Sequence, residues 1–429
     1  MELFELDLDR REAELRRRVY DEADFWANVP EDETAIVATY FIRARYGNLT
    51  EAGEAISYHM TSATKHPEPG SLVAQCTGWV AGVRAWDTQH KVGLVRVAFP
   101  VKQFERTDGT CYSTDLLHIA AGAGILALWD FAEAKLLDLN LPQSVIAGFP
   151  GPAYGCHGVI QRTNWPAGEP AFGTILKPTA GITPEEVADL VEAAAQQSLF
   201  LFVKEDENLF PDLPYSPAGQ RARLAAQAVE RALPEREGRG LLFCPHITAP
   251  PDRLLAVLDE VLEAGATGVM FSEQYLGGAT RLVRDHTKHL PEPPVIYGHN
   301  GGIDARTLTI WREVLDLLAR LDGIDFRQTA PLALGHPLLR PQGLEWRKSE
   351  EVLTRPIEGI KPVMVTRAGG LDQGNIIHNL EDVASHLGGN PVLFLAGSAI
   401  NSIKGPDGKA DPRVGAAAMR QAEIGRAHV

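Results

Sequence analysis

The sequence lacks any apolar run that approaches the roughly 20 residues needed to cross a bilayer. Residues 1–26, MELFELDLDRREAELRRRVYDEADFW, are rich in charge and amphipathic, which is not the pattern of a signal peptide. We therefore expect a soluble protein that has no membrane partner.

Cysteine is also scarce, with four residues in a chain of 429. No two of them form a CxxC pair or the spacing of a zinc site. They are Cys76, Cys111, Cys156 and Cys244. We expect reduced thiols in a cytoplasmic protein.

Basic residues are outnumbered, since 41 Lys and Arg against 56 Asp and Glu give a net charge of −15. Nucleic acid is therefore not an expected partner. An anionic substrate is not excluded, because a local site can be basic or can hold a metal. The hydrophobic and charged fractions, 45% and 23%, are those of an ordinary globular protein and name no function.

The length of the chain allows two domains. In the first part, residues 33–46 and 92–100 have the apolar content of strands, and residues 49–60 form a helical pattern between them. This mixture predicts a compact N-terminal α+β domain over residues 1–145.

From Pro150 onward, short apolar strands alternate with helical stretches. We expect strands at 172–177, 199–204, 241–247, 267–272, 294–299, 324–329, 361–366 and 391–396. We expect helices at 183–197, 250–265, 304–321 and 375–388. Eight such units predict a (β/α)8 TIM barrel over residues 146–422. A doubly wound open sheet is the alternative, and the absence of a Gly-rich dinucleotide loop after the first strand disfavours it.

The last seven residues, EIGRAHV (423–429), follow a helical stretch abruptly. A common sequencing adapter, read in frame, would encode this heptapeptide and a stop. We expect residues 423–429 to be an artefact on a truncated C-terminus, with a natural chain that continues.

In a TIM barrel, catalytic groups gather at the C-terminal ends of the strands. Every strand predicted here ends in a polar or Gly-rich group. In chain order these groups are Lys177; Lys204, Asp206 and Glu207; His246 and Thr248; Ser272 and Glu273; His299 and Asn300; Gln328 and Thr329; residues 366–370; and residues 396–398. This coincidence is the strongest physical indication of an active site in the chain.

The stretch LFLFVKEDENLF (199–210) runs from a buried strand into Lys204 and three acids. Burial disfavours an ammonium group and lowers the pKa of a lysine. A neutral amine can react with CO2 to form a carbamate, and its oxygens with those of Asp206 and Glu207 would suit Mg²⁺. An ion pair between Lys204 and these acids is the simpler interpretation of the four residues alone.

A wider pattern favours the carbamate. GTILKPTAG (173–181), FVKEDENLF, YGHNGG, GIDF, RAGG and LAGS occur in the order and spacing found in the large subunit of RuBisCO, which the chain resembles over essentially its whole length. The resemblance implies Mg²⁺ bound by carbamylated Lys204, Asp206 and Glu207. It also implies acid–base chemistry at Lys177, a substrate contact at His299, and a homodimer with active sites at the subunit interface.

The sequence departs from the carboxylases of that family at several groups. Residues 328–341, QTAPLALGHPLLRP, contain no lysine where carboxylases carry one on a mobile loop, and Thr179 replaces a second lysine. Other family groups correspond here to Asn300, Gln328, Ala368 and Gly124. Several of the lost groups bind a phosphate of a bisphosphate. The losses indicate the non-carboxylating branch, the RuBisCO-like proteins of form IV.

A phosphate site is expected after the seventh and eighth strands. Backbone N–H groups, a guanidinium and a hydroxyl are available there, from Arg367, Gly369, Gly370, Gly397 and Ser398. The alternative is that these glycines only form tight turns. For His246 a structural role is equally open, and His336 either replaces the lost loop lysine or is a solvated loop residue.

We therefore expect a Mg²⁺-dependent lyase or isomerase that enolises, isomerises or decarboxylates a phosphorylated keto-sugar or keto-sugar acid, with the keto acid favoured. The alternatives are a methionine-salvage enolase acting on a methylthio-ketose phosphate, a true ribulose-bisphosphate carboxylase, and a non-catalytic regulator. Gly124 stands near the position where the salvage enolases carry a lysine, which weakens the first alternative. Either Lys177 or the carbamate oxygen could be the base.

Overall fold

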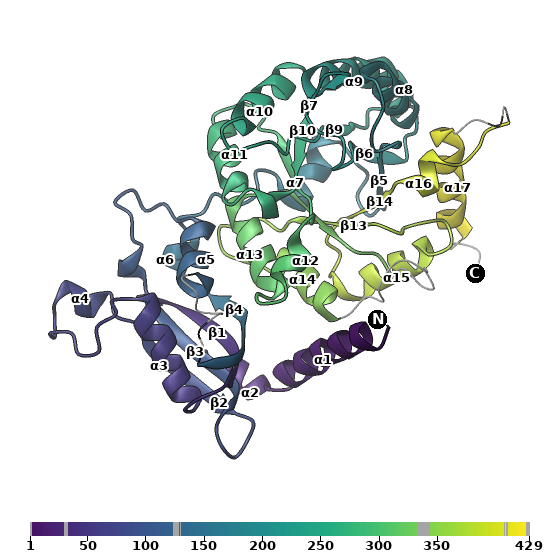
Figure 1. Ribbon diagram of the computed structural model, residues 1–429. Coiled ribbons are helices and arrows are strands. Elements are labelled where there is room, and N and C mark those ends of the chain that lie inside the picture. Colours follow the sequence, from purple (N-terminus) through teal and green to yellow (C-terminus); the bar gives the residue numbers. More distant parts are fainter. Residues whose placement is uncertain are drawn as a thin grey trace. The chain divides into compact units, whose positions relative to one another are not determined.

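The computed structural model describes residues 2–29, 33–122, 128, 130–332, 344–406, 408 and 411–425. Gly124, His336 and residues 426–429 lie outside the described residues. The chain divides into two compact units (Figure 1). The first comprises Met1–Phe149, Ile303–Leu321 and Gly343–Lys348, and the second comprises Pro150–Gly302, Asp322–Gln342 and Ser349–Val429.

The first unit is built on a four-stranded antiparallel sheet in the order β2-β3-β1-β4. Its strands are β1 (Ala35–Ala44), β2 (Trp79–Ala85), β3 (Val92–Pro100) and β4 (Phe131–Asn140). Its helices are α1 (Glu2–Tyr20), α2 (Ala23–Ala27), α3 (Leu49–Met60), α4 (Leu72–Gln75), η1 (Val101–Gln103), α5 (Ser113–Ala121), α6 (Gln143–Ile146) and α12 (Ile303–Arg306). The strands predicted within 33–46 and 92–100 and the helix at 49–60 are confirmed.

The single helix expected over 304–321 is wrong, because the chain breaks between α12 and α13 (Arg312–Asp322). Leu136 of β4 donates its N–H to Thr309 O at 2.8 Å, and Trp311 donates to Leu136 O at 2.8 Å. The β-branched residues Thr309 and Ile310 suit this extended pairing better than a helix. A contact distant in sequence therefore overrides the helical periodicity.

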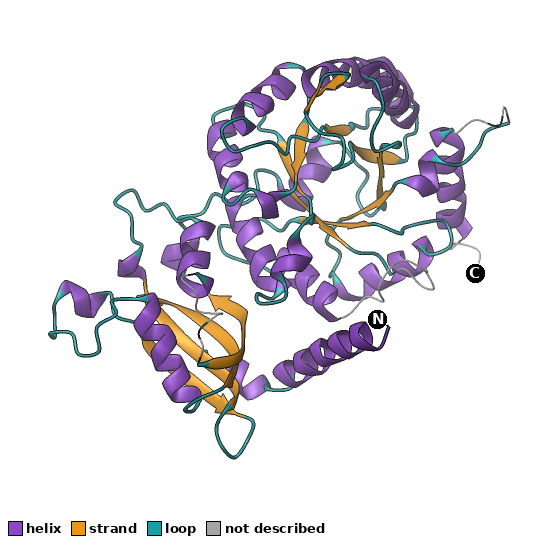
Figure 2. Cartoon of the chain, in the orientation of Figure 1, coloured by secondary structure: helices purple, strands orange, loops and turns teal. Residues whose placement is uncertain are grey.

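The second unit is an eight-stranded parallel sheet surrounded by helices (Figure 2). The barrel strands are β5 (Ala171–Ile175), β6 (Phe200–Lys204), β9 (Leu242–Cys244), β10 (Gly268–Phe271), β11 (Val295–Gly298), β12 (Phe326–Thr329), β13 (Met364–Ala368) and β14 (Val392–Ala396). A short hairpin of β7 (Asp212–Leu213) and β8 (Ser216–Pro217) follows β6. All eight strands predicted from the sequence are present.

The helices of this unit follow the strands in the alternation expected of a TIM barrel. They are α7 (Gly155–Arg162), α8 (Pro184–Ala195), α9 (Ala218–Ala232), η3 (Leu233–Arg236), α10 (Leu254–Glu263), η4 (Glu273–Tyr275), α11 (Ala279–Thr287), α15 (Ile376–His386), α16 (Ser398–Asn401) and α17 (Pro412–Gly425). Helices α13 and α14 (Leu344–Thr354) have residues in both units. The Thr183 side chain caps α8 in a capping box with Glu186.

Hydrogen bonds between the first and last strands of the sheet order nearly close the barrel. The strands run β10-β11-β12-β13-β14-β5-β6-β9. Ile247 donates its N–H to Met270 O at 2.9 Å, and Met270 donates to Pro245 O at 3.0 Å, so the chain after β9 pairs with β10. The predicted fold, an N-terminal α+β domain followed by a (β/α)8 barrel, is confirmed.

Aromatic side chains fill the barrel interior. The Phe202 ring lies 5.4 Å from that of Tyr297 and 4.8 Å from that of Phe326, between centroids, and all three side chains are fully buried. Close aromatic packing of this kind stabilises a core beyond simple burial of area. These side chains occupy the interior of the barrel, so a substrate site is expected at the ends of the strands.

Asp325 fixes the amino-terminal end of the barrel. One of its oxygens accepts hydrogen bonds from the N–H groups of Tyr154 (2.7 Å) and Gly155 (3.0 Å), at the start of α7. The other accepts from Ile296 N–H at 3.0 Å and from the Arg284 guanidinium at 2.7 Å. The carboxylate is fully buried, so these four donors replace its hydration.

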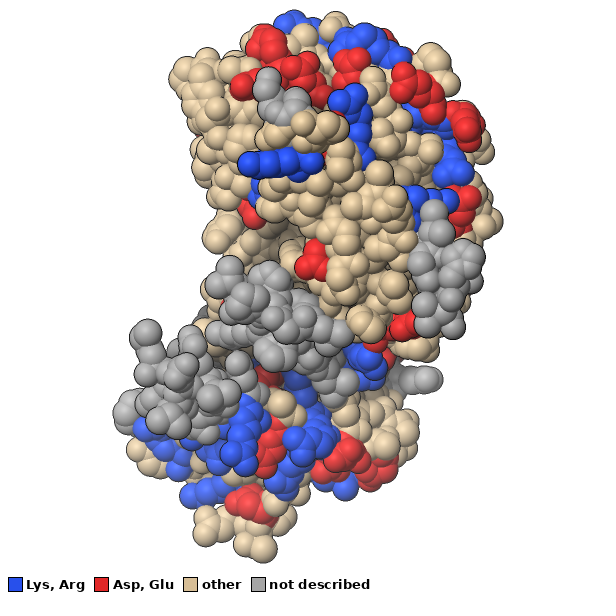
Figure 3. Space-filling view, turned by 90° about the vertical axis from the view of Figure 1, so that its right-hand side faces the viewer, with Lys and Arg blue, Asp and Glu red and all other residues tan. Residues whose placement is uncertain are grey.

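None of the described helices is both long and apolar enough to cross a membrane. The four cysteines are free thiols, and Cys156 and Cys244 are buried. On the face shown in Figure 3, basic and acidic side chains are interspersed.

We predict that Asp325→Ala lowers the free energy of unfolding by about 3–5 kcal/mol, because it leaves the buried Arg284 without its carboxylate partner and three N–H groups without their acceptor. Urea unfolding followed by circular dichroism measures the change. Asp259→Ala is the control, since Asp259 pairs with His286 at the surface (2.7 Å) and its loss should change stability by less than about 0.5 kcal/mol. Equal effects of the two substitutions would contradict this role for Asp325.

Candidate active site

The alternation of side chains along β6 sorts the residues of the KEDE stretch. Phe202 points into the barrel core, and Lys204, two residues later, lies on the same side of the strand. The Lys204 ammonium lies 5.5 Å from the centre of the Tyr297 ring, at the C-terminal limit of the aromatic core. Glu205 faces the opposite way, toward α9.

Lys204 is fully buried. Among the described residues its nitrogen donates one hydrogen bond, to Glu205 O at 3.0 Å, and lies 3.6 Å from Glu207 Oε2. Burial lowers the pKa of the Lys204 ammonium, although the charges of Glu207 and Asp206 oppose this effect. Burial therefore shifts the equilibrium of the Lys204 side chain from the ammonium toward the neutral amine.

Asp206 lies between Lys177 and Asn208. Its Oδ2 accepts a hydrogen bond from Lys177 Nζ at 2.6 Å, and its Oδ1 accepts from the backbone and side-chain N–H groups of Asn208 at 3.1 and 3.0 Å. The Asp206 side chain is 5% exposed and that of Lys177 is 27% exposed. Lys177 therefore links a buried carboxylate to the open side of the site.

Glu207 contacts His299, which follows β11. His299 Nε2 lies 3.2 Å from Glu207 Oε2, and the Gly301 N–H donates to His299 Nδ1 at 3.0 Å. Since Nδ1 accepts, we assign the ring proton to Nε2, which donates to the carboxylate. Burial lowers the pKa of His299. Although burial opposes ionisation of Glu207, the His299 hydrogen bond and the Lys204 charge lower the pKa of that carboxyl group.

These contacts test whether the residues fit a divalent cation. Among the described residues, no three His, Cys, Asp or Glu side chains converge as metal ligands. Asp206 and Glu207 supply two carboxylates beside Lys204, and a hard cation such as Mg²⁺ prefers oxygen ligands. The donor set fits Mg²⁺ if Lys204 supplies the third anionic group, as its carbamate would.

Glu205 is the acid of this stretch whose role the sequence did not reveal. Its carboxylate binds Arg221 of α9 in a bidentate pair, at 2.7 and 2.9 Å, and both side chains are fully buried. Glu205 Oε2 also accepts the N–H of His246 at 2.9 Å. The pair ties β6 to α9 and to the end of β9. Alternation continued from β6 could have separated Glu205 from Lys204 and Asp206, whereas Glu207 lies in the turn after the strand, where alternation no longer applies.

His246 is held in a chain of hydrogen bonds. Its Nδ1 donates to Leu209 O at 3.1 Å, because a carbonyl can only accept, and its Nε2 accepts from the Thr248 hydroxyl at 2.5 Å. Thr248 Oγ1 in turn accepts the Ser272 N–H at 2.9 Å. Burial lowers the pKa of His246 to about 4. Of the two roles left open for this histidine, these contacts favour the structural one.

The residues expected to bind phosphate divide into two groups. Gly369 and Gly370, after β13, have φ values of +89° and +85°, and nothing lies within 4 Å of a Cβ built on Gly369. Ser398, at the start of α16, is exposed, and a Cβ built on Gly397 would lie 3.3 Å from Lys177 Cε. The open ends of β13 and β14 thus lie on the same side of the barrel as Lys177.

Arg367 does not share this exposure. Its guanidinium is buried and donates to Glu350 (3.1 and 2.9 Å), Asp382 (2.6 Å) and Asn379 (3.2 Å). With its N–H groups used within the chain, Arg367 cannot offer them to a phosphate in this arrangement. Its assignment to the phosphate site is corrected for this physical reason.

Gln328, at the end of β12, reaches the same side of the barrel. Its Oε1 accepts a hydrogen bond from the Tyr297 hydroxyl at 2.8 Å, so Gln328 is connected to the ring that lies under Lys204.

A cavity of about 610 Å³ lies elsewhere, lined by residues that include His157, Arg162 and Lys361. These residues belong to α7 and to the segment before β13, at the amino-terminal end of the barrel, where none of the expected site residues lies.

Comparisons with known proteins relate the chain to one family. Residues 159–336 match the family described as "Ribulose bisphosphate carboxylase large chain, catalytic domain". An uncharacterised ribulose bisphosphate carboxylase-like protein of Bordetella bronchiseptica is 30% identical over 300 residues, which cover 67% of this chain and 66% of that protein. The chain belongs to the RuBisCO large-chain family.

Two further relatives carry more specific names. A 3-oxo-isoapionate-4-phosphate transcarboxylase/hydrolase of Xanthobacter autotrophicus is 32% identical over 210 residues, 49% of this chain and 47% of that protein. The crystal structure of a RuBisCO-like protein (MtnW) from Alicyclobacillus acidocaldarius has a TM-score of 0.77 and 25% identity, covering 93% of this chain and 94% of that one. The chain thus spans about half to two thirds of the length of the first two relatives.

We predict that protonation of His246 destabilises the fold in mild acid. Its folded pKa of about 4 lies below the unfolded value of about 6.5, so between these values the unfolded chain binds the proton and stability falls as pH falls. From pH 7 to pH 5 the loss is about 2 kcal/mol.

The free energy of urea unfolding at the two pH values, for the wild type and His246→Asn, measures this term. The asparagine variant should lack it while retaining a donor toward Leu209. The same pH dependence in both proteins would exclude His246 as its source.

Proposed function

We propose that the protein is a Mg²⁺-dependent, non-carboxylating enzyme of the RuBisCO superfamily. It removes a proton, or a carboxyl group as CO2, from the carbon next to a carbonyl in a phosphorylated keto-sugar or keto-sugar acid. The observation that carries the proposal is the fully buried Lys204 amine beside Asp206 and Glu207.

The lowered pKa of Lys204 supports carbamylation. A neutral amine attacks CO2, the new N–C bond forms, and one proton leaves the nitrogen, so the cationic form of the side chain is exchanged for an anionic one. The three anionic groups of Lys204, Asp206 and Glu207 would then hold Mg²⁺, and the bound ion would stabilise the oxyanion that develops on the substrate carbonyl.

Lys177 is the residue of this chain best placed to move a proton. Its Nζ lies 2.6 Å from Asp206 and part of its side chain is exposed, so it can reach both the buried acids and a substrate above them. The carbamate oxygen of Lys204 is the competing base. His299, whose Nε2–H lies against Glu207, orients that carboxylate and lies within reach of the same substrate.

The phosphate of the substrate would bind at the ends of β13 and β14. Gly369 leaves its backbone open and Gly370 follows it, while Gly397 lies next to Lys177 and precedes the exposed Ser398. Backbone N–H groups and one hydroxyl suit a phosphate. With Arg367 engaged elsewhere, this site would have a weaker positive charge than the sequence suggested.

Several residues argue against carboxylation. The segment 328–341 contains no lysine, and Thr179, Asn300, Gln328 and Ala368 stand where carboxylases carry other groups. The Xanthobacter relative, named for a 3-oxo-isoapionate 4-phosphate reaction, supports a phosphorylated 3-oxo acid as the substrate class. We further propose that the enzyme acts in the cytoplasm as a homodimer with its active sites at the subunit interface.

We predict that 3-oxo-isoapionate 4-phosphate is converted only after incubation with Mg²⁺ and bicarbonate. Lys204→Met should lower kcat/KM by at least about 100-fold, because the third anionic ligand is lost. Substrate loss and CO2 release, each followed with time, measure the reaction. Lys288→Met, which replaces a 69% exposed lysine of the same unit, is the matched control and should retain full activity.

Two parallel assays separate the alternatives. Turnover of a methylthio-ketose phosphate instead of the 3-oxo acid would favour salvage-type enolisation. Acid-stable label from bicarbonate fixed onto ribulose bisphosphate would establish a carboxylase and refute the proposal, and so would full activity of Lys204→Met.

A further inference from the structure

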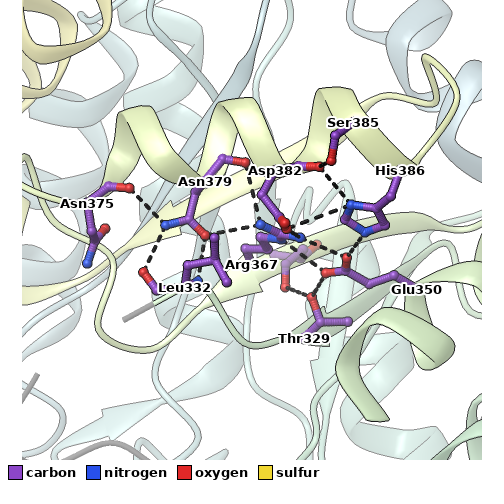
Figure 4. Close-up of polar contacts among 10 residues, drawn as sticks. Thr329, Leu332, Glu350, Arg367, Asn375, Asn379, Asp382, Ser385 and His386 are labelled. Atoms are coloured by element: carbon purple, nitrogen blue, oxygen red, sulfur yellow. Dashed lines mark hydrogen bonds and ion pairs between the residues drawn. The ribbon is translucent and has the colours of Figure 1, made fainter. Parts of the chain in front are cut away.

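A buried charged cluster connects the C-terminal ends of β12 and β13 to helices α14 and α15 (Figure 4). Glu350 of α14 binds Arg367 of β13 through two hydrogen bonds, and Asp382 and His386 of α15 complete the set. Glu350 and Arg367 are each 1% exposed. None of these four residues has a role in the chemistry proposed above.

The contacts of His386 define its charge. Its Nδ1 contacts Asp382 O at 2.7 Å and its Nε2 contacts Glu350 Oε2 at 2.7 Å. A carbonyl and a carboxylate both accept, so both ring nitrogens donate and the ring is an imidazolium. The hydrogen bond to Glu350 raises the pKa of His386, in agreement. Two cations and two anions then balance within the cluster, which offsets the cost of burying each charge.

The cluster holds Asn379 in a fixed orientation. Arg367 donates to Asn379 Oδ1 at 3.2 Å and to Asn379 O at 3.4 Å. Asn379 Oδ1 also accepts the N–H of Leu332 at 2.7 Å, while its Nδ2 donates to Leu332 O at 3.1 Å. A single side-chain amide thus pairs with both backbone groups of Leu332, as a neighbouring strand would, and aspartate or leucine could not make both bonds.

The same cluster reaches β12 directly. The buried Thr329 hydroxyl donates to Glu350 Oε1 at 2.9 Å. Thr329 faces the cluster, so its neighbour Gln328 faces the opposite side of the strand, where it contacts Tyr297 under Lys204. Two anchors, at Thr329 and Leu332, therefore fix the backbone on one side of the site.

We infer that Asn379, oriented by the Glu350–Arg367–Asp382–His386 cluster, is a positioning residue for the backbone from Thr329 to Leu332. Through this anchoring it fixes the position of Gln328 in the candidate active site. The anchoring itself is independent of any reaction. Its effect on turnover rests on the proposed function, so the two parts have separate tests.

Hydrogen exchange tests the anchoring in the full-length protein. In Asn379→Leu, which has a similar volume but can neither accept the Leu332 N–H nor donate to Leu332 O, exchange at the Leu332 amide should accelerate about tenfold or more. His378→Ala, one residue earlier on α15 and exposed, should leave it unchanged. Peptides from β14 should exchange as in the wild type in both variants.

A second pair of variants covers the case in which Asn379→Leu does not fold. Thr329→Val removes the hydroxyl that binds Glu350, and Thr329→Ser retains it, so only the valine variant should accelerate exchange at the Leu332 amide. Unchanged exchange at Leu332 in folded Asn379→Leu, or equal acceleration throughout the barrel, would overturn the inference.

Turnover tests the effect on the site. With 3-oxo-isoapionate 4-phosphate as the probe, Asn379→Leu should lower kcat about tenfold and leave the Mg²⁺ concentration for half-activation unchanged, because the proposed ligands lie on and after β6. An equal loss of Mg²⁺ activation would indicate general damage and count against positioning. If the wild type does not convert this probe, the proposed function fails, while the exchange experiment still decides the anchoring.

Discussion

The site depends on one constraint, a fully buried amine at the end of β6. Lys204 lies where this strand leaves the aromatic core of the barrel, and its side chain has no access to water. Phe202 and Tyr297 fill the space below it, and the acids that follow occupy the space above. An ammonium is poorly stabilised in such a place, and the contacts around it follow from this constraint. Lys177 binds Asp206, and His299 binds Glu207, so each acid has a partner other than the buried amine.

The surrounding scaffold can be understood as support for that strand end. Glu205, on the other face of β6, forms a buried bidentate pair with Arg221 and accepts the His246 N–H, which fixes the strand against its helix and its neighbour. The consecutive acids of residues 205–207 therefore have different roles. Glu205 stabilises the barrel, while Asp206 and Glu207 are the acids proposed to hold Mg²⁺. Alternation separates Glu205 from Asp206, and the turn that begins at Glu207 separates it from Glu207.

The sequence alone was sufficient for the architecture of the second unit, because each barrel strand is a short apolar run between polar ends. It was less informative in the first unit. Strands β2 and β4 were missed, since β2 is largely half-exposed and β4 mixes charged residues with leucines. The break between α12 and α13 depends on pairing with β4, a contact that no local pattern encodes.

The same distinction applies to the site. Lys204, Asp206 and Glu207 are neighbours in the chain, so their proximity could be predicted, and the barrel topology was enough to bring Lys177 and His299 to the same end. Arg367 was misjudged because its partners, Glu350 and Asp382, come from α14 and α15, and no local pattern shows that side chains of these two helices meet at β13. Ion pairs between buried side chains of different elements cannot be recognised from the sequence of either element alone.

The balance of charge in that buried set has an evolutionary consequence. Replacing one of the four charged members by a neutral residue leaves a surplus charge enclosed in the protein, whereas replacing a cation and an anion together does not. Relatives of this chain should therefore retain all four or exchange them in opposite-sign pairs. Covariation among these positions would be a signature of electroneutrality rather than of shared chemistry.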